Sequence, residues 1–198
     1  MKNVTQIDLF ILGAPKTGTT ALLRHLEQSP EIYTHEQREM VYFYSDYEYE
    51  KGWDYATKKY FPDLQQGVIL AKHVKEASSA IAMQRLKKNS PNVKCIFMVR
   101  EPASRAYSAY KYAVLRGIET LETFEEALKK EDERFHKSEK NNSSLFYLRD
   151  SLYAEKIKLC FEIFGKESVL IIYQENYKAN PITHLGMIEA LIGRKLFS

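Results

Sequence analysis

Four short, largely apolar runs, each followed by a segment with helical periodicity, constrain the fold of this 198-residue chain most strongly. Apolar runs of five or six residues are typical of parallel strands that are buried on both faces. The strand candidates are residues 7–12, 68–72, 94–99 and 168–173, and the helix candidates are residues 19–28, 53–61, 79–88, 103–115, 123–133, 148–164 and 181–192. Strands that alternate with helices predict an α/β fold with a central, mainly parallel sheet between layers of helices.

Two regions fit this alternation less well. Residues 31–44 are aromatic and mixed, which favours a short strand followed by a loop. Residues 135–144 are polar and lack periodicity, so we predict a mobile loop there. No internal repeat or convincing domain boundary interrupts the chain, which predicts a single domain over residues 1–198.

Composition excludes several classes of function. A formal net charge of +3 without a Lys/Arg block argues against nucleic-acid binding, and no apolar run reaches the length of a membrane span. Cys95 and Cys160 have neither metal-ligand nor disulfide-framework spacing, so we interpret both as core thiols in a reducing compartment. The polar N-terminus leads straight into a strand without a signal peptide, which favours a cytoplasmic protein or a domain cut from a longer one.

The segment from Gly13 to Thr20 joins the first predicted strand to the first predicted helix. Backbone N–H groups at a helix N-terminus are unpaired, and the helix dipole adds partial positive charge there. Glycines let the main chain approach an anion closely, so this arrangement predicts a phosphate cradle. A generic strand–helix turn is the alternative.

The same segment departs from the nucleotide P-loop, Gly-x4-Gly-Lys-Ser/Thr. Gly13 and Gly18 have the right spacing, but Thr19 stands where a P-loop has its lysine, and the lysine lies inside the loop as Lys16. No convincing acidic residue for magnesium follows a strand, since the third strand ends at Arg100. The fold is therefore P-loop-like, while a nucleotide kinase or NTPase is a less favoured alternative.

A second segment, residues 100–108, predicts another anion contact. Arg100 follows an apolar strand, and ligands in open α/β sheets bind at the carboxyl ends of the strands. A guanidinium offers a planar fork that matches phosphate, and the Ser108 hydroxyl on the next helix adds one donor. Alternatively, Arg100 and Arg105 pair with carboxylates.

Together the two segments resemble the PAPS-dependent sulfotransferases, where PAPS is 3'-phosphoadenosine-5'-phosphosulfate. Gly13-x-x-Lys16-x-Gly18-Thr19-Thr20 resembles the loop that binds the 5'-phosphosulfate, and Arg100 with Ser108 resembles the pair that binds the 3'-phosphate. Residues 38–43 resemble the Lys-Glu-x-His-Phe-Phe pattern of the heparan-sulfate-type and related bacterial enzymes, except that Val41 replaces its histidine.

The resemblance implies specific roles. It assigns binding of PAPS, and of its product PAP, to Pro15, Lys16, Thr17, Gly18, Thr19, Thr20, Arg100 and Ser108. It makes Glu39 the catalytic base and Lys16 the cation at the leaving oxygen, without a requirement for metal. Lys72 or His73 would stabilise the sulfuryl oxygens, and His73 is a rival base because its unperturbed pKa lies near neutrality.

The resemblance leaves the acceptor and the C-terminus open. A small molecule or a glycan with a hydroxyl or amine fits the family, and Tyr42, Phe43, Tyr44 and Trp53 could line its cleft or belong to the core. Relatives carry a C-terminal Lys/Arg-Gly loop on the 3'-phosphate, whereas residues 193–198 offer no clear counterpart. That loop is truncated, replaced or disordered, so a non-catalytic PAP(S)-binding module remains an alternative.

Overall fold

The computed structural model describes residues 6–63, 67–136 and 144–197, and a five-stranded sheet forms the centre of this part of the chain. The strands are β1 (Leu9–Gly13), β2 (Ile32–Thr34), β3 (Val68–Lys72), β4 (Lys94–Val99) and β5 (Val169–Tyr173). They lie in the order β2-β3-β1-β4-β5, and all of these pairings are parallel. The predicted α/β fold is confirmed.

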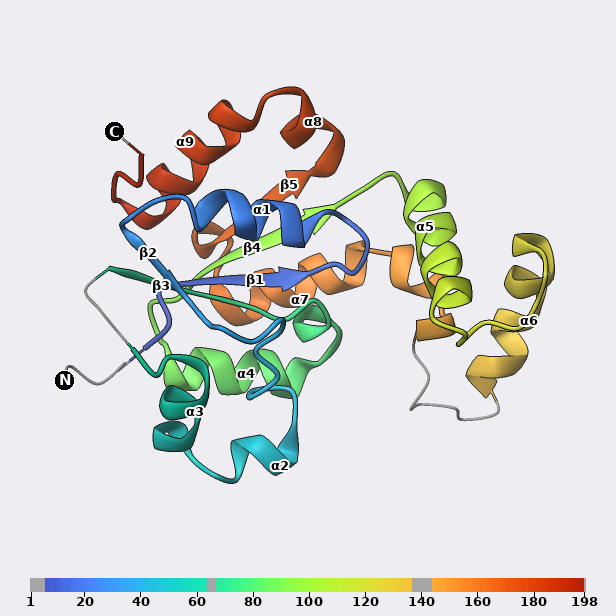
Figure 1. Ribbon diagram of the computed structural model, residues 1–198, viewed down its shortest axis with the longest axis horizontal. Coiled ribbons are helices and arrows are strands. Elements are labelled where there is room, and N and C mark those ends of the chain that lie inside the picture. The colour runs from blue at the N-terminus through green and yellow to red at the C-terminus, as the bar shows by residue number, and fades with distance from the viewer. Residues whose placement is uncertain (1–5, 64–66, 137–143, 198) are drawn as a thin grey trace.

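Helices cover both faces of the sheet and make three layers (Figure 1). One face packs on α1 (Thr19–Leu26), α8 (Gln174–Ala179) and α9 (Pro181–Ile192), and the other packs on α3 (Trp53–Tyr60), α4 (Ala80–Asn89) and α7 (Ala154–Phe164). The central strands are buried on both sides, as their unbroken apolar sequences predict. In the described ranges, no helix combines the length and apolarity that a membrane crossing needs.

Helix α5 (Pro102–Leu115) leads away from the sheet to α6 (Phe124–His136), which Figure 1 shows beyond α5. A separate apolar cluster joins these two helices to Leu145 and Tyr147. The described residues also form α2 (Asp46–Tyr49) and the short 3-10 helices Glu76–Ser78, Arg149–Ser151 and Lys166–Ser168.

Two expectations from the sequence need correction, and two short helices were missed. The helix predicted over residues 148–164 begins only at Ala154, because Leu152 has an extended backbone after the Arg149–Ser151 turn. Helix α6 continues to His136, into the predicted loop, and residues 137–143 of that loop lie outside the described residues. Helices α2 and α8 were not predicted, since both are too short to show an apolar period.

The Glu119 side chain stabilises the turn between α5 and α6 through hydrogen bonds. It is 5% exposed, and its carboxylate accepts bonds from Arg134 (2.7 and 2.8 Å), the Tyr147 hydroxyl (2.7 Å) and the Leu121 N–H (3.0 Å). Burial alone would raise the pKa of Glu119, but these donors outweigh it and lower that pKa to about 2. A carboxyl whose pKa is depressed by folding stabilises the protein above its unfolded pKa and loses that effect as pH falls.

We therefore expect Glu119→Gln to lower the free energy of unfolding at pH 7 by about 2–3 kcal/mol. The difference from the unmodified protein should shrink between about pH 5 and pH 2, because Glu119 itself becomes protonated there. Urea unfolding across this range measures it. Glu125→Gln, an exposed change on the neighbouring helix α6, is the matched control, and equal losses in both variants would contradict the role of Glu119.

Candidate functional site

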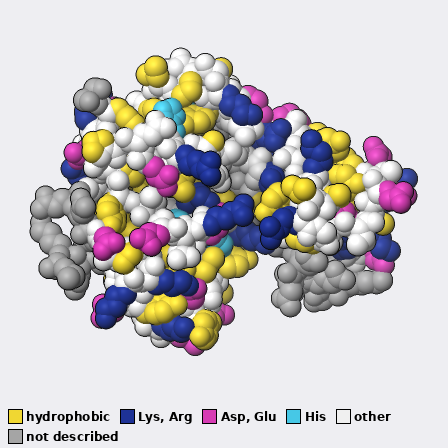
Figure 2. Space-filling view, viewed as in Figure 1, with side chains coloured by type: hydrophobic (Ala, Val, Ile, Leu, Met, Phe, Trp, Pro, Cys, Tyr) yellow, Lys and Arg dark blue, Asp and Glu magenta, His cyan; other side chains and the backbone are white. Residues whose placement is uncertain are grey.

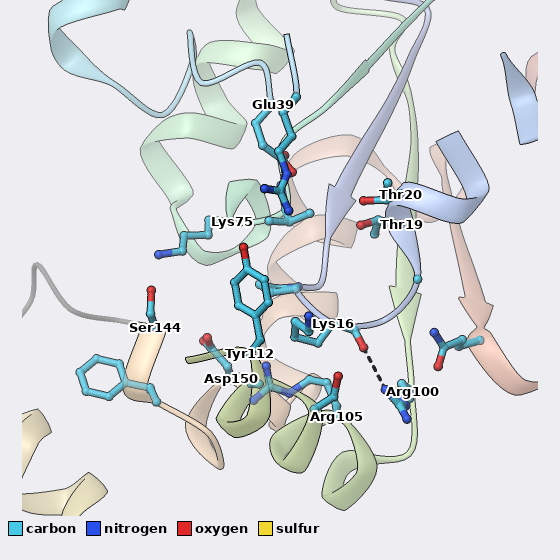
Figure 3. Close-up of a pocket in the computed structure, with 18 residues that line it drawn as sticks. Lys16, Thr19, Thr20, Glu39, Lys75, Arg100, Arg105, Tyr112, Ser144 and Asp150 are labelled. Atoms are coloured by element: carbon cyan, nitrogen blue, oxygen red, sulfur yellow. Dashed lines mark hydrogen bonds between the residues drawn. The ribbon is translucent and has the colours of Figure 1, made fainter. Parts of the chain in front are cut away.

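A cavity of about 570 Å³ opens at the carboxyl ends of the strands, beside the loop after β1 and against α5. Figure 2 shows Lys and Arg side chains gathered where the body of the sheet meets the α5–α6 region. Figure 3 shows side chains from several separate elements converging on the cavity, among them Lys16, Glu39, Arg100 and Tyr112. This is the sheet edge at which the sequence predicts a ligand.

The loop between β1 and α1 has a backbone suited to an anion. Gly18 is the N-cap of α1 with φ 91°, and no side chain caps the helix, so its first N–H groups have no side-chain partner there. A Cβ on Gly18 would lie 2.7 Å from Nε2 of Gln174, and one on Gly13 would lie 2.4 Å from the Val74 carbonyl oxygen. Close approach to the Val74 backbone and positive φ therefore both require glycine at position 13, while at position 18, where the flexible end of the Gln174 side chain can move, the positive φ is what favours glycine.

Thr17 shapes this loop from within. Its side chain is fully buried, and its hydroxyl donates to the Ala14 carbonyl at 2.7 Å. Pro15, Lys16, Gly18, Thr19 and Thr20 line the cavity, whereas Thr17 does not. Of the six predicted loop residues, Thr17 is thus placed to hold the turn rather than to contact a ligand through its side chain.

Arg100 and Ser108 both line the cavity, from the end of β4 and from α5. Arg100 Nη1 lies 3.5 Å from the Lys16 carbonyl oxygen, and the Arg100 carbonyl accepts a bond from the Tyr153 hydroxyl at 3.1 Å. The N-terminus of α5 is well capped. The Glu101 carboxylate accepts hydrogen bonds from two N–H groups of the first turn, and Pro102 is the first helical residue.

Arg105 is a buried cation at the same cavity. It is 1% exposed, and it donates to the Ser151 hydroxyl at 2.6 Å and to the Tyr147 carbonyl. Within the described ranges, neither Arg100 nor Arg105 forms an ion pair with a carboxylate, so the alternative stated for them gains no support. A buried guanidinium whose hydrogen-bond acceptors are neutral suits an anionic ligand.

Lys16 adopts positive φ, 69°, and its ammonium lies 4.1 Å from the centre of the Tyr112 ring. Burial lowers the pKa of Lys16, and the nearby Arg38, Arg100 and Arg105 lower it further, while Tyr112 acts in the opposite direction. Three arginines therefore act on the Lys16 ammonium and make this part of the cavity strongly positive.

Glu39 also lines the cavity, on the side away from Lys16 (Figure 3). Its carboxylate accepts one bond from the Lys72 ammonium and another, at 3.0 Å, from the Val74 N–H. Lys72 itself is 1% exposed and does not line the cavity. The alternative pairing of Glu39 with Arg38 is not what the structure has, because Lys72 occupies that role.

His73 lies outside the cavity, behind the part of its wall that Glu39 and Val74 form. Its Nδ1 is 2.8 Å from the buried Glu76 carboxylate, its ring packs on Tyr44, and it does not line the cavity. Burial raises the pKa of Glu76, an effect that the bond to His73 opposes. His35, interpreted from the sequence as structural, accepts the Lys72 N–H at 3.1 Å, and burial lowers the pKa of His35 to about 4.

Several lining residues were not predicted from the sequence. They are Arg38, Val74, Lys75, Arg105, Ala109, Tyr112, Ser144, Phe146, Asp150 and Gln174. A signal existed for some of them: Arg105, Ala109 and Tyr112 follow one another at spacings of four and three residues, and they share one face of α5 with the predicted Ser108. Gln174 directly follows β5, at the ligand edge of the sheet.

Several known proteins are similar to this chain. A family model described as "Sulfotransferase domain" matches residues 6–197. Mouse heparan sulfate glucosamine 3-O-sulfotransferase 5 is 26% identical over 191 residues, which cover 92% of this chain and 52% of that protein. Human bifunctional heparan sulfate N-deacetylase/N-sulfotransferase 1 is 24% identical over 194 residues, 93% of this chain and 22% of that protein. The chain therefore spans about half the length of these curated relatives, or less.

Solved structures of sulfotransferases are also similar to this chain. A sulfotransferase from Alicyclobacillus acidocaldarius is 27% identical, with a TM-score of 0.86 over 98% of this chain and 84% of that chain. Mouse sulfotransferase SULT7A1, solved in complex with PAP, is 17% identical, with a TM-score of 0.59 over 97% of this chain and 60% of that chain. The second likeness concerns the fold alone.

Proposed function

Because the chain belongs to the sulfotransferase domain family, as the resemblance of its two loops predicted, we propose that it transfers the sulfuryl group of PAPS to a hydroxyl or amine. One observation carries the proposal: Lys16, Arg100 and Glu39, from three separate elements, line one cavity. A phosphate cradle, a cation and a carboxylate within a single cavity are what in-line transfer from an anionic donor requires.

The residues present fit PAPS and PAP. The uncapped N-terminus of α1 and the Thr19 and Thr20 hydroxyls would hold the 5'-phosphate. Arg100 and Ser108 would hold the 3'-phosphate, as the family resemblance implies. Arg105, buried without a carboxylate partner, supplies positive charge that an anionic cofactor would balance.

The protein residues divide the chemistry between them. Bound PAPS supplies an activated sulfuryl group, and Lys16 stabilises the negative charge that develops on the leaving phosphate oxygen. Glu39 takes the proton of the acceptor hydroxyl or amine, while Lys72 and the Val74 N–H keep its carboxylate in place. His73 is the weaker candidate for the base, since its ring nitrogen already bonds Glu76 and it does not line the cavity.

A second hollow of about 410 Å³ adjoins the cavity and shares Lys75, Phe146 and Asp150 with it. Tyr44, 41% exposed, forms part of its wall, whereas Tyr42 and Phe43 belong to the core. We place the acceptor across this boundary, because Glu39 then faces it from the cavity side. A small molecule or a glycan fits such a space, and a cytoplasmic location and independence of metal stay predictions.

The proposal is tested by incubating the protein with sulfur-labelled PAPS and a panel of phenols, alcohols, amines and unsulfated or sulfated oligosaccharides. Transfer of label to at least one acceptor, strongly reduced in Lys16→Met, is expected. Calorimetry with PAP and with ATP and magnesium separates the alternatives. Metal-free binding of PAP without turnover of any acceptor would favour a binding module, and magnesium-dependent binding of ATP would favour a kinase.

We expect Arg100→Ala to weaken PAP binding by about 10–100-fold, the usual cost of losing a charged hydrogen bond to phosphate. Binding of adenosine 5'-monophosphate, which lacks the 3'-phosphate, should change by less than about threefold. Calorimetry measures both. The matched control is Arg116→Ala, an exposed change at the end of α5. Equal losses for the two nucleotides would contradict the assignment of Arg100 to the 3'-phosphate.

A further inference from the structure

We propose that Tyr112 is a positioning residue that holds the Lys16 ammonium in place through the face of its aromatic ring. Tyr112 stands on α5 one turn after Ser108, and the Lys16 Nζ lies 4.1 Å from its ring centre. This distance is well inside the range of about 6 Å over which a cation is attracted to an aromatic face. Its consequence for catalysis rests on the proposed function, but the contact itself does not.

Figure 3 shows how the Tyr112 ring lies in the cavity. The Tyr112 ring extends from α5 into the cavity beside Lys16, and its hydroxyl points away from Lys16 toward the side where Glu39 and Lys75 lie. The contact with Lys16 is therefore made by the ring and not by the hydroxyl. A phenylalanine at this position would keep it, whereas an aliphatic residue would remove it.

Lys16 needs such a partner because its surroundings oppose its charge. Arg38, Arg100 and Arg105 are the cations that act on it, and it is itself half-buried. Within the described residues, no carboxylate forms an ion pair with Lys16. Burial and the three arginines lower the pKa of Lys16, so a contact that stabilises the ammonium, such as the one with the Tyr112 ring, opposes their effect.

A ring is better suited to this position than a carboxylate. A carboxylate would hold the ammonium strongly, but it would also repel the phosphates and the sulfuryl group of the donor. The quadrupole of a ring stabilises the cation without adding a net negative charge. The Lys16 backbone is already held by its turn and by the contact of its carbonyl with Arg100, so the free end of the side chain is what remains to be positioned.

The test measures the pKa of Lys16 directly, by pH-dependent competitive acetylation read by mass spectrometry on the intact chain. With Tyr112→Leu we expect the pKa of Lys16 to fall by about 0.5–1 unit, the shift that corresponds to a partly exposed cation–π contact. Tyr112→Phe should leave it within about 0.2 unit. The matched control is Tyr107→Leu, which removes a tyrosine of the same helix that also carries a lysine, Lys111, 5.1 Å from its ring centre but outside the cavity.

A series of fluorinated phenylalanines at position 112 keeps the shape of the side chain and so avoids any loss of fold. Each added fluorine weakens the negative face of the ring, so the pKa of Lys16 should fall stepwise along the series. An unchanged pKa along this series, or in a folded Tyr112→Leu variant, would overturn the proposal.

Turnover supplies a second and separate readout. If an acceptor is found, the basic limb of the kcat–pH profile should move in Tyr112→Leu by the same amount as the pKa of Lys16. The KM for PAPS should change by less than about threefold, because a neutral ring adds little to the binding of phosphates. A pKa that shifts as expected in a protein that sulfates no acceptor supports the role of Tyr112 and contradicts the proposed function. Turnover with an unshifted pKa does the reverse.

Discussion

Replacement of Lys16 by methionine should lower kcat for sulfuryl transfer by about 10²–10³-fold, the range observed when a preorganised donor to a developing oxyanion is removed. Methionine keeps the length and much of the volume of the side chain and can still rest on the Tyr112 ring. What it loses is the positive charge on the side of the cavity opposite Glu39. The charge on the leaving oxygen grows toward the transition state, so the loss falls mainly on kcat.

Binding of PAP should weaken by less than about tenfold in the same variant, because Arg100, Arg105 and the N–H groups of the loop remain. Single-turnover measurements with saturating PAPS, combined with calorimetry for PAP, separate the two effects. Lys111→Met removes one charge from the exposed side of α5 and serves as the control. A large loss of PAP affinity with unchanged kcat would make Lys16 a binding residue only.

The fold was accessible from the sequence because its signals are local. Runs such as residues 68–72 and 94–99 are apolar throughout, and a strand buried on both faces needs no more specification than that. Helix α9 likewise begins where Asn180 and Pro181 predict, with the Asn180 side chain accepting the Thr183 N–H. Short elements such as α2 and α8 escaped, since one turn of helix has no period to detect.

The interruption before α7 shows the limit of periodicity. Residues 148–164 have a continuous amphipathic pattern, but the backbone leaves the helix at Leu152. The cause is a contact with a residue far away in the sequence. The Ser151 hydroxyl accepts a hydrogen bond from the buried Arg105 of α5 and donates one to the Tyr147 carbonyl. A tertiary bond of this kind overrides local preference, and no window of sequence reveals it.

The site was predictable where residue type and strand end coincide. Arg100 follows β4 and the loop of Lys16 follows β1, and the order of parallel strands brings both to one edge. The pairing of Glu39 with Lys72 needed the structure, because it depends on how the segment after β2 folds over β3. Residues such as Phe146 and Asp150 reach the cavity from a segment without a distinguishing pattern.

The second large effect is expected for Glu39→Gln, which should lower kcat by about 10²–10⁴-fold, the range for loss of a general base. Glutamine keeps the shape of the side chain and can still accept the Val74 N–H through its amide oxygen. It cannot take a proton from the acceptor. The affinity for PAP should stay within about threefold, because the residues assigned to its phosphates are untouched.

Glu39→Gln also removes the charged partner of Lys72, a lysine that is 1% exposed. Breaking a buried pair by removing one member destabilises a protein, so part of any loss of activity could come from the fold. The double variant Glu39→Gln/Lys72→Met separates the two causes, since replacing both members removes the uncompensated buried charge. We expect its melting temperature to recover toward that of the unmodified protein, while its kcat stays low.

Two further variants decide between the candidate bases. Glu36→Gln alters an exposed carboxyl three residues earlier in the same segment and should keep full activity. His73→Gln should reduce kcat by less than about tenfold, because His73 pairs with Glu76 and does not line the cavity. If Glu39→Gln retains near-full activity while His73→Gln abolishes it, the base is His73 and the wall between it and the cavity must open during turnover. Glu39→Gln and His73→Gln therefore test together which residue is the base and whether the cavity wall between them stays closed.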